Sequence, residues 1–526
     1  MIFLRRRPPS FSLPFPLCRN FSCSPHRSSS STTSLSSLPL HIGIIGAGPS
    51  GFYAATRLLS LPGSENTRVD LFEALPVPFG LARFGVAPDH PEVKNCEHKF
   101  EETARDPRFR FFGNVELASA TTSASKSAPS LSAYSLKISL DRLKPHYDAL
   151  LLTYGASNSR PLSIPGEDEL SHVLPARDFV AWYNAHPSPS HPASSSNSLP
   201  QNIDLSKLTT VTLIGQGNVA LDIARLLLSP LSSLSSTDLP ESVLAELSRS
   251  TVKRVKIVGR RGPLQLAATT KEVREMMALP NVGFSIDQQL LAGSLRDYEA
   301  NKEMRGGRGK KRALEVLKKG SLSKAGSTDK EWSFEFLKSP LELLSRDSDP
   351  GRLGRVKWGF NELLMPEGGG DPADCIARAT GRTEVEETDL VLSSVGYRSV
   401  EIPGIPFDKR RGVVRNEGGR VLSEDGAPIK GLYASGWLAR GPNGVIATTM
   451  YDAFATADLL ASDLASPTSV PAMKDDFSIE ALRGDSKVVT WQDWENIDRE
   501  ERRRGEEKGK VREKMQSVEE MLSWVK

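Results

Sequence analysis

Short, largely apolar runs recur along the chain and lead into glycine-rich turns, as buried parallel strands often do. Residues 42–45 form the first run, and a glycine and then a helical apolar pattern reaching residue 58 follow it. Residues 68–72 predict the next strand, while residues 210–214 and 252–258 predict a second pair with a helix between its members. Strands that alternate with helices in this way predict an α/β fold built on parallel sheets.

The first turn has three glycines at the G-x-G-x-x-G spacing: Gly46, Gly48 and Gly51. The first lets the chain turn tightly, the second lets a pyrophosphate approach the backbone, and the third lets the helix pack close to its strand. The helix N-terminus then offers free N–H groups and a partial positive charge. We therefore expect these glycines and Ala47 to line a dinucleotide site. A glycine turn that binds no ligand is the alternative that spacing alone leaves open.

The strand at residues 68–72 ends at an acidic residue, Glu73. A carboxylate in this place can accept hydrogen bonds from both hydroxyls of an adenosine ribose. The gap from the glycines is longer than usual, and a loop at residues 61–67 accounts for the difference. Strand, glycine turn, helix, strand and acid together predict one dinucleotide half-site.

The same order of elements begins again at residue 209, with Gly215 and Gly217 in the turn and Ala220 in the third position, where alanine is permitted. Its second strand ends in Arg260-Arg261 instead of an acid. Paired arginines offer forked donors to a 2′-phosphate, which an acid would repel. At roughly 1.5–3 kcal/mol per charge-assisted hydrogen bond, two contacts favour NADPH over NADH by about 10² or more. The alternative is a solvated arginine pair on a surface loop.

The two half-sites thus have opposite charge: the first suits FAD and the second NADP(H). This combination is typical of a flavin-dependent pyridine nucleotide oxidoreductase. A third glycine-rich element, around Gly436 and Trp437, leads into a helix that starts near residues 444–446. Its N-terminus would place amide donors beside the flavin pyrimidine. Trp437 would cover the isoalloxazine or, alternatively, be a half-buried core residue.

This third element lies more than 350 residues after the first turn, so the FAD-binding domain must be discontinuous. We expect two Rossmann-like dinucleotide-binding domains, with the NADP-binding domain at residues 159–394 inserted between the two parts of the FAD-binding domain, residues 41–158 and 395–526. The final stretch, residues 491–526, mixes charges of both signs and predicts exposed helices.

Composition narrows the class of protein. The chain has 526 residues, enough for two or three domains, and its 38% hydrophobic and 25% charged content is that of a globular protein. The four cysteines form no C-x-x-C pair, so they predict neither a disulfide framework nor a dithiol centre nor a cluster site. No apolar run resembles a membrane span.

The first 40 residues are rich in arginine and serine and contain no acid; the first acidic residue is Glu65. This composition predicts an organellar transit peptide, and an uncleaved disordered tail is the alternative. Loss of its five arginines would change the formal net charge from +3 to about −2. A globally basic nucleic-acid binder is therefore not expected.

A basic run at residues 305–312 is followed by Lys318 and Lys319. Such runs usually form a solvated helix face. Here a cationic patch would also steer an acidic electron carrier toward the protein.

Several of these segments carry a family resemblance: VPFGLARFGVAPDHPEVKN (77–95), GQGNVALDIAR (215–225), GRRGPLQ (259–265), KEVREM (271–276) and GWLARGPNGVI (436–446). On them the chain resembles the adrenodoxin reductase family, the mitochondrial-type ferredoxin–NADP+ reductases, over nearly all of residues 41–526. The Ser-rich stretches 118–133 and 186–201 depart from the family pattern and are expected to be loops.

The resemblance implies the following site residues. Those expected at FAD are Ala47, Glu73, Leu81, Leu117, Trp437, Gly444, Val445 and Ile446, with Leu117 replacing a smaller apolar residue of the family. Those expected at NADP(H) are Gln216, Gly217, Asn218, Val219, Arg260, Arg261 and Glu272, with Gly444 near the nicotinamide. His90 and Asp222 match residues near the domain interface. Arg308, Lys310, Lys311 and Arg312 resemble the ferredoxin-docking cluster.

The resemblance implies an NADPH:ferredoxin oxidoreductase, which passes a hydride from NADPH to FAD and then single electrons to an acidic, adrenodoxin-type [2Fe-2S] ferredoxin. That ferredoxin would feed mitochondrial P450, heme or iron–sulfur pathways. The cofactors supply this chemistry, so no acid–base residue pair is expected. We expect a monomer in the mitochondrial matrix, associated at most peripherally with the inner membrane, and no nucleic-acid partner. The missing C-x-x-C argues against a dithiol reductase, while a flavin-binding redox sensor or scaffold remains the alternative.

Overall fold

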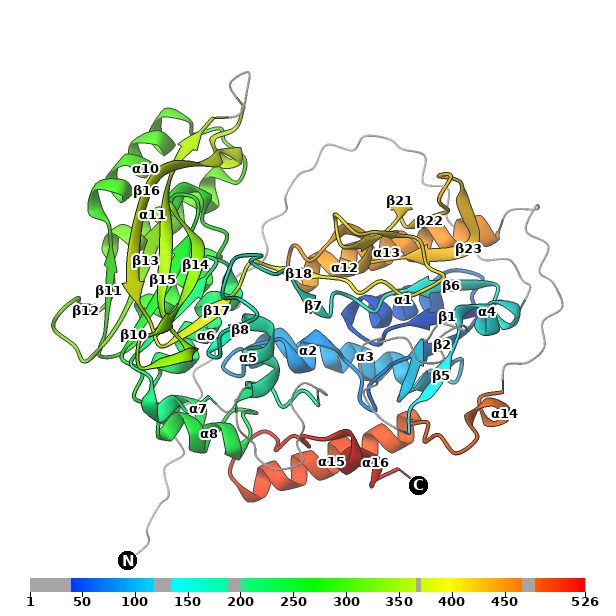
Figure 1. The fold of residues 1–526 in the computed structure, drawn as a ribbon. Coiled ribbons are helices and arrows are strands. Elements are labelled where there is room, and N and C mark those ends of the chain that lie inside the picture. Colours follow the sequence, from blue (N-terminus) through cyan, green and yellow to red (C-terminus); the bar gives the residue numbers. More distant parts are fainter. Residues whose placement is uncertain are drawn as a thin grey trace, which may run out of the picture.

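The computed structural model describes residues 39–117, 134–187, 199–200, 203–365, 370–465 and 478–525. Two lobes, each built on a seven-stranded sheet, lie side by side (Figure 1). The expected transit peptide and the two Ser-rich stretches lie almost wholly outside the described residues.

The first sheet joins strands from both ends of the chain, in the order β21-β22-β23-β6-β1-β2-β3. β1 pairs in parallel with β2 on one side and with β6 on the other, and β23 pairs in parallel with β6. The bounds are β1 His41–Ile45, β2 Arg68–Phe72, β3 Phe109–Phe112, β6 Ala149–Leu152, β21 Asn416–Glu417, β22 Arg420–Leu422 and β23 Pro428–Ala434. The first lobe is therefore discontinuous in sequence, as predicted.

Helices α1 (Pro49–Ser60) and α13 (Ile446–Leu464) pack against each other in this lobe, although the whole second lobe separates them in sequence. Their contact buries Ala54, Leu58 and Ala457 in one apolar core. The smaller elements are α2 Leu81–Phe84, η1 Pro91–Asn95, α3 Cys96–Ala104, β4 Val115–Leu117, β5 Leu136–Ile138, α4 Leu140–Leu143, η2 Lys144–His146, β19 Phe407–Asp408, β20 Val413–Val414 and α12 Trp437–Arg440.

The second sheet has the order β12-β11-β13-β10-β9-β17-β8, and its neighbouring strands pair in parallel. Its strands are β8 Val173–Pro175, β9 Thr210–Ile214, β10 Arg254–Gly259, β11 Val282–Ile286, β12 Ser323–Lys324, β13 Lys330–Phe336 and β17 Leu390–Ser393. The helical elements of this lobe are α5 Ala176–Tyr183, η4 Leu205–Lys207, α6 Asn218–Leu228, α7 Leu231–Leu234, α8 Glu241–Ser248, η5 Pro263–Gln265, α9 Thr270–Met277, α10 Gln288–Ala300, α11 Gly307–Lys319 and η6 Pro372–Asp374.

A three-stranded antiparallel sheet in the second lobe had no counterpart among the predicted elements. It consists of β14 (Lys338–Arg346), β15 (Asp349–Leu364) and β16 (Ile376–Glu387). Its inner side chains, among them Leu353 and Trp358, form one apolar cluster with residues of the parallel sheet. The two chain crossings between the lobes also pair, as β7 (Asn158–Ser159) with β18 (Tyr397–Arg398).

The C-terminal segment forms α14 (Glu480–Arg483), α15 (Trp491–Glu507) and α16 (Val518–Leu522), and it lies beneath both lobes in Figure 1. Helices were predicted here, but the prediction that the segment is exposed was wrong. Ile497 and Glu501 are 0% exposed and Lys514 is 2% exposed. The charged side chains can be buried because they pair with charges of the first and second lobes. No described helix is long and apolar enough to cross a membrane.

Candidate functional site

In the first glycine turn, neighbouring atoms leave no space for a side chain at Gly46 or Gly51, whereas there is space at Gly48. Gly46 has φ +111°, and a Cβ there would lie 2.6 Å from the Tyr154 backbone. A Cβ on Gly51 would lie 2.1 Å from the Gly46 carbonyl oxygen. At Gly48, by contrast, no described atom lies within 4 Å of the Cβ position, and no described side chain caps the N-terminus of α1. The free amides therefore face a cradle that a phosphate would fit.

Glu73 follows β2 and reaches back to this turn. Its Oε2 accepts the Ala47 amide at 2.8 Å, and its Oε1 accepts the Leu75 amide at 3.2 Å. Burial raises the pKa of Glu73, and the backbone hydrogen bonds oppose that rise. Because a carboxylate oxygen can accept more than one hydrogen bond, both oxygens can still accept ligand hydroxyls.

Two segments distant in sequence meet the first turn. The Phe79 amide donates to the Ala47 carbonyl at 2.8 Å, and Leu81, which starts α2, is 37% exposed. From the C-terminal part of the chain, Gly436 comes so close to α1 that a Cβ there would lie 2.8 Å from the Ser50 hydroxyl. The structure thus brings predicted residues from three parts of the sequence to one turn. Leu117 lies at the end of β4, half-buried against a neighbouring apolar cluster.

Trp437 stacks on Tyr397, with ring centroids 5.9 Å apart and an interplanar angle of 23°. Its buried Nε1 has no hydrogen-bond partner in the described part of the chain. The start of α13 at Ile446 is likewise uncapped by any described side chain, and Val445 before it is 54% exposed. An orphaned donor and free helix amides fit a flavin ring with its polar edge. Sequence reasoning missed Tyr397, whose only signal was its place beside the second chain crossing.

The second turn repeats the geometry of the first. A Cβ on Gly215 would lie 2.1 Å from the Ser394 carbonyl oxygen, whereas the Cβ position of Gly217 has no described atom within 4 Å. α6 follows directly and lacks a side-chain cap among the described residues. Gln216 is buried beside the turn, and the Asn218 side chain accepts the Thr269 amide at 2.8 Å. Val219 is half-buried on the helix.

The arginine pair follows β10 at the same edge of the sheet. Arg260 is exposed and Arg261 is half-buried. Their backbone carbonyls accept hydrogen bonds from the Asn361 side chain at 3.1 Å and from the Leu337 amide at 3.3 Å. Within the described ranges, neither guanidinium pairs with a carboxylate, so both are available to an anion.

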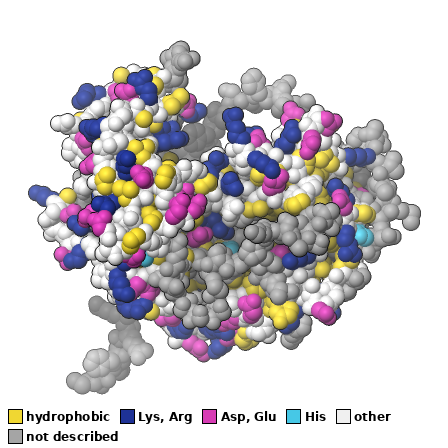
Figure 2. All heavy atoms as spheres, in the orientation of Figure 1, with side chains coloured by type: hydrophobic (Ala, Val, Ile, Leu, Met, Phe, Trp, Pro, Cys, Tyr) yellow, Lys and Arg dark blue, Asp and Glu magenta, His cyan; other side chains and the backbone are white. Residues whose placement is uncertain are grey.

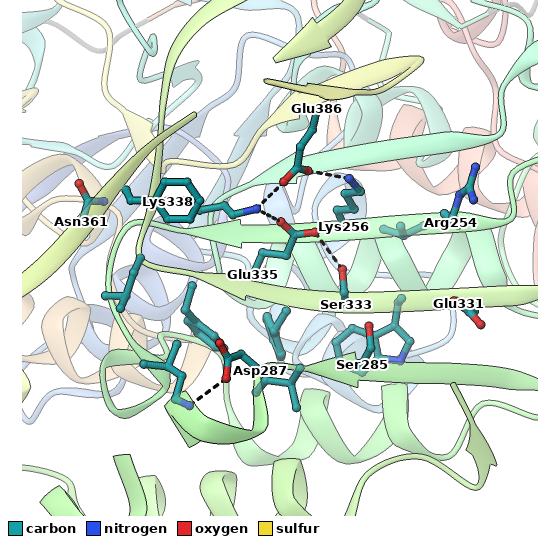
Figure 3. A pocket seen from close by; sticks show the side chains of 18 of the residues that line it. Arg254, Lys256, Ser285, Asp287, Glu331, Ser333, Glu335, Lys338, Asn361 and Glu386 are labelled. Carbon is teal, nitrogen blue, oxygen red and sulfur yellow. Dashed lines mark hydrogen bonds and ion pairs between the residues drawn. The ribbon is translucent and has the colours of Figure 1, made fainter. Parts of the chain in front are cut away.

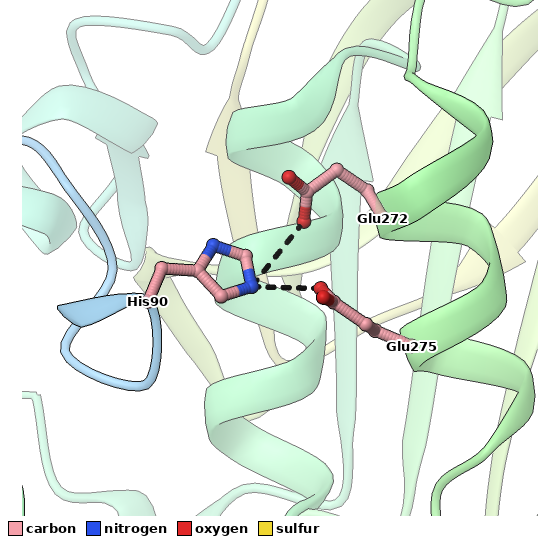
Figure 4. Close-up of side chains that lie close together, drawn as sticks. All are labelled: His90, Glu272 and Glu275. Carbon is pink, nitrogen blue, oxygen red and sulfur yellow. Dashed lines mark hydrogen bonds and ion pairs between the residues drawn. The ribbon is translucent and has the colours of Figure 1, made fainter. Parts of the chain in front are cut away.

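A charged cluster joins the two lobes where the loop at residues 89–90 meets α6 and α9 (Figure 4). The ring of His90 lies 2.7 Å from Glu275 and 3.8 Å from Glu272. Burial raises the pKa of Glu272 to about 7, with a further contribution from the nearby charge of Asp222. The structure therefore places both predicted interface residues, His90 and Asp222, around Glu272.

Arg225 supplies the positive charge of this cluster and was not singled out from the sequence. Its guanidinium bonds Asp89 at 2.5 Å, Asp222 at 2.8 Å and Glu272 at 3.0 Å. The oxygen and nitrogen atoms of His90, Glu272 and Glu275 lie within 4.8 Å of one another, as in a metal site. The Arg225 guanidinium already lies 3.0 Å from Glu272 and 3.6 Å from Glu275 there. Its partner Asp89 is remote in sequence, which is why the motif pattern did not reveal the pair.

Comparisons with known proteins agree with this geometry. A model of the NAD(P)-binding Rossmann-like domain matches residues 44–113. The mitochondrial NADPH:adrenodoxin oxidoreductase of Salvelinus fontinalis is 41% identical and covers 94% of this chain and 92% of its own. That of Drosophila melanogaster is 42% identical over 91% of this chain and 92% of its own.

The chain belongs to the NADPH:adrenodoxin oxidoreductase family. The resemblance inferred from the sequence motifs is thereby confirmed. A solved structure of Mycobacterium tuberculosis FprA in complex with NADPH is 38% identical, covers 92% of this chain and 99% of its own, and superposes with a TM-score of 0.77. The predicted fold of two Rossmann-like units, one inserted in the other, is also confirmed.

The basic run of this family member forms the first turns of α11. Arg308, Lys311 and Arg312 are exposed, and among the described residues only Lys311 of these three has an ion-pair partner, Glu315 at 3.9 Å. Lys310 differs from them: it is half-buried, and its Nζ donates to the Leu264 carbonyl at 2.7 Å. The four predicted docking residues therefore do not share one surface.

A pocket of about 890 Å³ lies between the second sheet and the three-stranded sheet (Figure 3). Four of its charged side chains pair with one another: Lys256 donates to Glu386 at 2.6 Å, and Lys338 donates to Glu335 at 2.7 Å. Asn361 lines the pocket and also braces the backbone of Arg260. Asn361 thus connects the wall of the pocket with the backbone of the arginine pair.

On the face seen in Figure 2, Lys and Arg side chains are interspersed with Asp and Glu over both lobes. Any cationic docking surface of the protein is therefore local on this face.

Proposed function

We propose that this chain is a FAD-dependent NADPH:ferredoxin reductase. The observation that carries the proposal is a charge contrast between two similar units: Glu73 follows β2, whereas Arg260 and Arg261 follow β10. Bound FAD would accept a hydride from NADPH and release the electrons one at a time to a [2Fe-2S] ferredoxin. The family membership and the likeness to an NADPH-bound structure support this assignment.

The first lobe would hold FAD. The uncapped amides at Gly48 would bind the pyrophosphate, and Glu73 would accept the ribose hydroxyls. Trp437 and the N-terminus of α13 would border the flavin ring, where the helix dipole stabilises negative charge. We assign residues 41–158 and 395–526 to this domain and 159–394 to the NADP-binding domain. Support comes from the pairing of β7 with β18, which sets the two chain crossings side by side at these boundaries.

The second lobe would hold NADPH, with its pyrophosphate at Gln216–Val219 and its 2′-phosphate at the arginine pair. Arg225, His90 and the acids around them would hold the two lobes in the orientation that brings both nucleotides together. These residues position the domains and transfer no proton in the proposed reaction.

The exposed face of α11 would dock an acidic ferredoxin. Arg308, Lys311 and Arg312 would attract its acidic side chains and raise the association rate at low salt. We place the protein in mitochondria, as the names of its relatives indicate for them, and more specifically in the matrix, with peripheral contact to the inner membrane. We propose a monomer.

Anaerobic titration of the purified, flavin-loaded protein tests the proposal. NADPH is expected to bleach the flavin band, and cytochrome c reduction is expected to depend on added [2Fe-2S] ferredoxin. Substitution Arg260→Glu is expected to raise the KM for NADPH far more than the KM for NADH, because the new carboxylate repels the 2′-phosphate. A redox sensor or scaffold would leave the band unbleached. Equal effects on both coenzymes would remove Arg260 from the phosphate site.

A further inference from the structure

Lys310 lies on a different face of α11 from its basic neighbours. With Ala313, Leu314 and Leu317 it shares the buried face of the helix, at the i, i+3, i+4 and i+7 spacing of one helical stripe. Arg308 and Lys311 point to solvent instead. A half-buried lysine on this stripe is poorly placed to meet a protein partner.

The buried face of α11 packs against the segment that follows the arginine pair. Lys310 Nζ donates to the carbonyl of Leu264, which lies in η5 directly after Arg260-Arg261-Gly262. A second contact holds the same region, because the Thr270 hydroxyl donates to the Gly309 carbonyl at 3.3 Å. The first turn of α11 is therefore fixed to the loop that carries the proposed 2′-phosphate site.

The ammonium of Lys310 lies among charges of both signs. Burial lowers the pKa of Lys310, the Asp371 and Asp374 carboxylates oppose this change, and the Arg261 and Arg305 guanidinium groups add to it. The Arg305 guanidinium pairs with Asp374, while Asp371 accepts the backbone amide of Arg305 at 2.5 Å. In the described ranges no carboxylate pairs with either Arg261 or Lys310.

An ammonium has three donors, and the Leu264 carbonyl takes one of them. Two donors remain on a cation that lies near Arg261 and forms no ion pair within the described ranges. A phosphate dianion would accept hydrogen bonds from both groups.

We propose that Lys310 is a specificity-determining residue for the 2′-phosphate of NADPH and does not belong to the ferredoxin-docking surface. The inference rests on the proposed NADPH-linked function and adds a third cation, from another helix, to its arginine pair. Arg308, Lys311 and Arg312 then form the docking face without it.

Calorimetric titration of the FAD-loaded protein with 2′,5′-ADP and with 5′-AMP tests this assignment, since the two ligands differ only in the 2′-phosphate. Lys310→Met is expected to weaken 2′,5′-ADP binding roughly ten- to hundredfold, the range of one charge-assisted hydrogen bond, and to leave 5′-AMP binding unchanged. Lys310→Arg is expected to retain most of the preference. The matched control is Lys311→Met, which is expected to leave both affinities unchanged and to raise the KM for ferredoxin.

Two outcomes would overturn the inference. Lys310→Met could raise the KM for ferredoxin with 2′,5′-ADP affinity unchanged, which would return the residue to docking. It could instead weaken both nucleotides equally, which would mean that the loop had loosened. If the unsubstituted protein itself fails to distinguish 2′,5′-ADP from 5′-AMP, the proposed NADPH-linked function fails as well. A preference that Lys310→Met leaves intact removes Lys310 alone.

Discussion

Glu501→Gln is expected to destabilise the protein strongly, although it removes only one charge. The Glu501 side chain is 0% exposed and accepts hydrogen bonds from Arg83 at 2.6 and 2.8 Å, from Arg512 at 3.0 Å and from the Met515 amide at 2.9 Å. Glutamine has nearly the same volume, but its amide nitrogen is a donor that would face other donors. The substitution therefore leaves buried positive charge without compensation.

The size of the effect depends on which ion-pair partners each arginine retains after the substitution. Removal of one partner from a buried ion pair costs about 3–5 kcal/mol. Arg512 retains Asp498 at 2.6 Å, so most of the loss concerns Arg83, which is 2% exposed. We expect a loss near the lower end, about 3 kcal/mol, which is a large part of the 5–15 kcal/mol that typically stabilises a domain.

Heating the flavin-loaded protein and following flavin fluorescence measures the effect, because Arg83 lies in α2 beside the first glycine turn. The midpoint of flavin release is expected to fall by several degrees. Glu507→Gln is the matched control: Glu507 is in the same helix, but its side chain is 62% exposed and pairs with Arg503, so its loss should cost at most about 1 kcal/mol. Equal shifts in the two variants would refute the reasoning that burial decides the cost.

Two further predictions concern the second lobe. Gly215→Ala is expected to unfold this lobe, because its Cβ would lie 2.1 Å from the Ser394 carbonyl oxygen at φ +127°. Gly217→Ala, by contrast, should fold and mainly raise the KM for NADPH. Circular dichroism with steady-state kinetics separates the two variants, and equal unfolding of both would contradict the open space at Gly217. Glu272→Gln is expected to stabilise the protein by about 2 kcal/mol more at pH 8 than at pH 5.5 in urea unfolding. Burial raises the pKa of Glu272 from 4.5 to about 7, so the stability present below pH 4.5 is lost as the pH rises through 7. Glutamine stays neutral over this range, which gives the sign of the difference. A difference in stability that does not change with pH would contradict the prediction.

Local spacing was enough to predict the nucleotide turns. Glycines at 46, 48 and 51 and the acid after the next strand are separated by few elements, so each strand, turn and helix could be placed from its own residues. The parallel pairing of β1 with β2 follows from the same unit. The pairing of β6 with β23, by contrast, joins distant parts of the chain. Only the glycine-rich motif near the C-terminus indicated that these parts belong to one domain.

Other features depend on partners that are remote in sequence. In the sequence, Arg225 looks like an ordinary arginine of a helix. Only the structure shows that Asp89, more than a hundred residues earlier, pairs with it. In the sequence, Lys310 looks like a surface cation, because its neighbours in the basic run are also cations. Its position on the buried stripe of α11 becomes clear only in the structure. The C-terminal segment was expected to be exposed for the same reason, since charged residues suggest solvent until their buried counter-charges are located.

The buried charges of the C-terminal segment act on orientation as much as on stability. One oxygen of Asp238, in the second lobe, lies 2.6 Å from the ammonium of Lys94 in the first lobe and 2.9 Å from that of Lys514 in the C-terminal segment. Apolar surfaces can slide past each other at little cost, whereas a hydrogen-bonded ion pair is lost within about an ångström. Three separate parts of the chain therefore meet at one atom, which fixes the second lobe against the first. The Glu501→Gln variant weakens the contacts with Arg512 and the Met515 amide, which flank Lys514, so a slower NADPH-linked rate should accompany its lower stability.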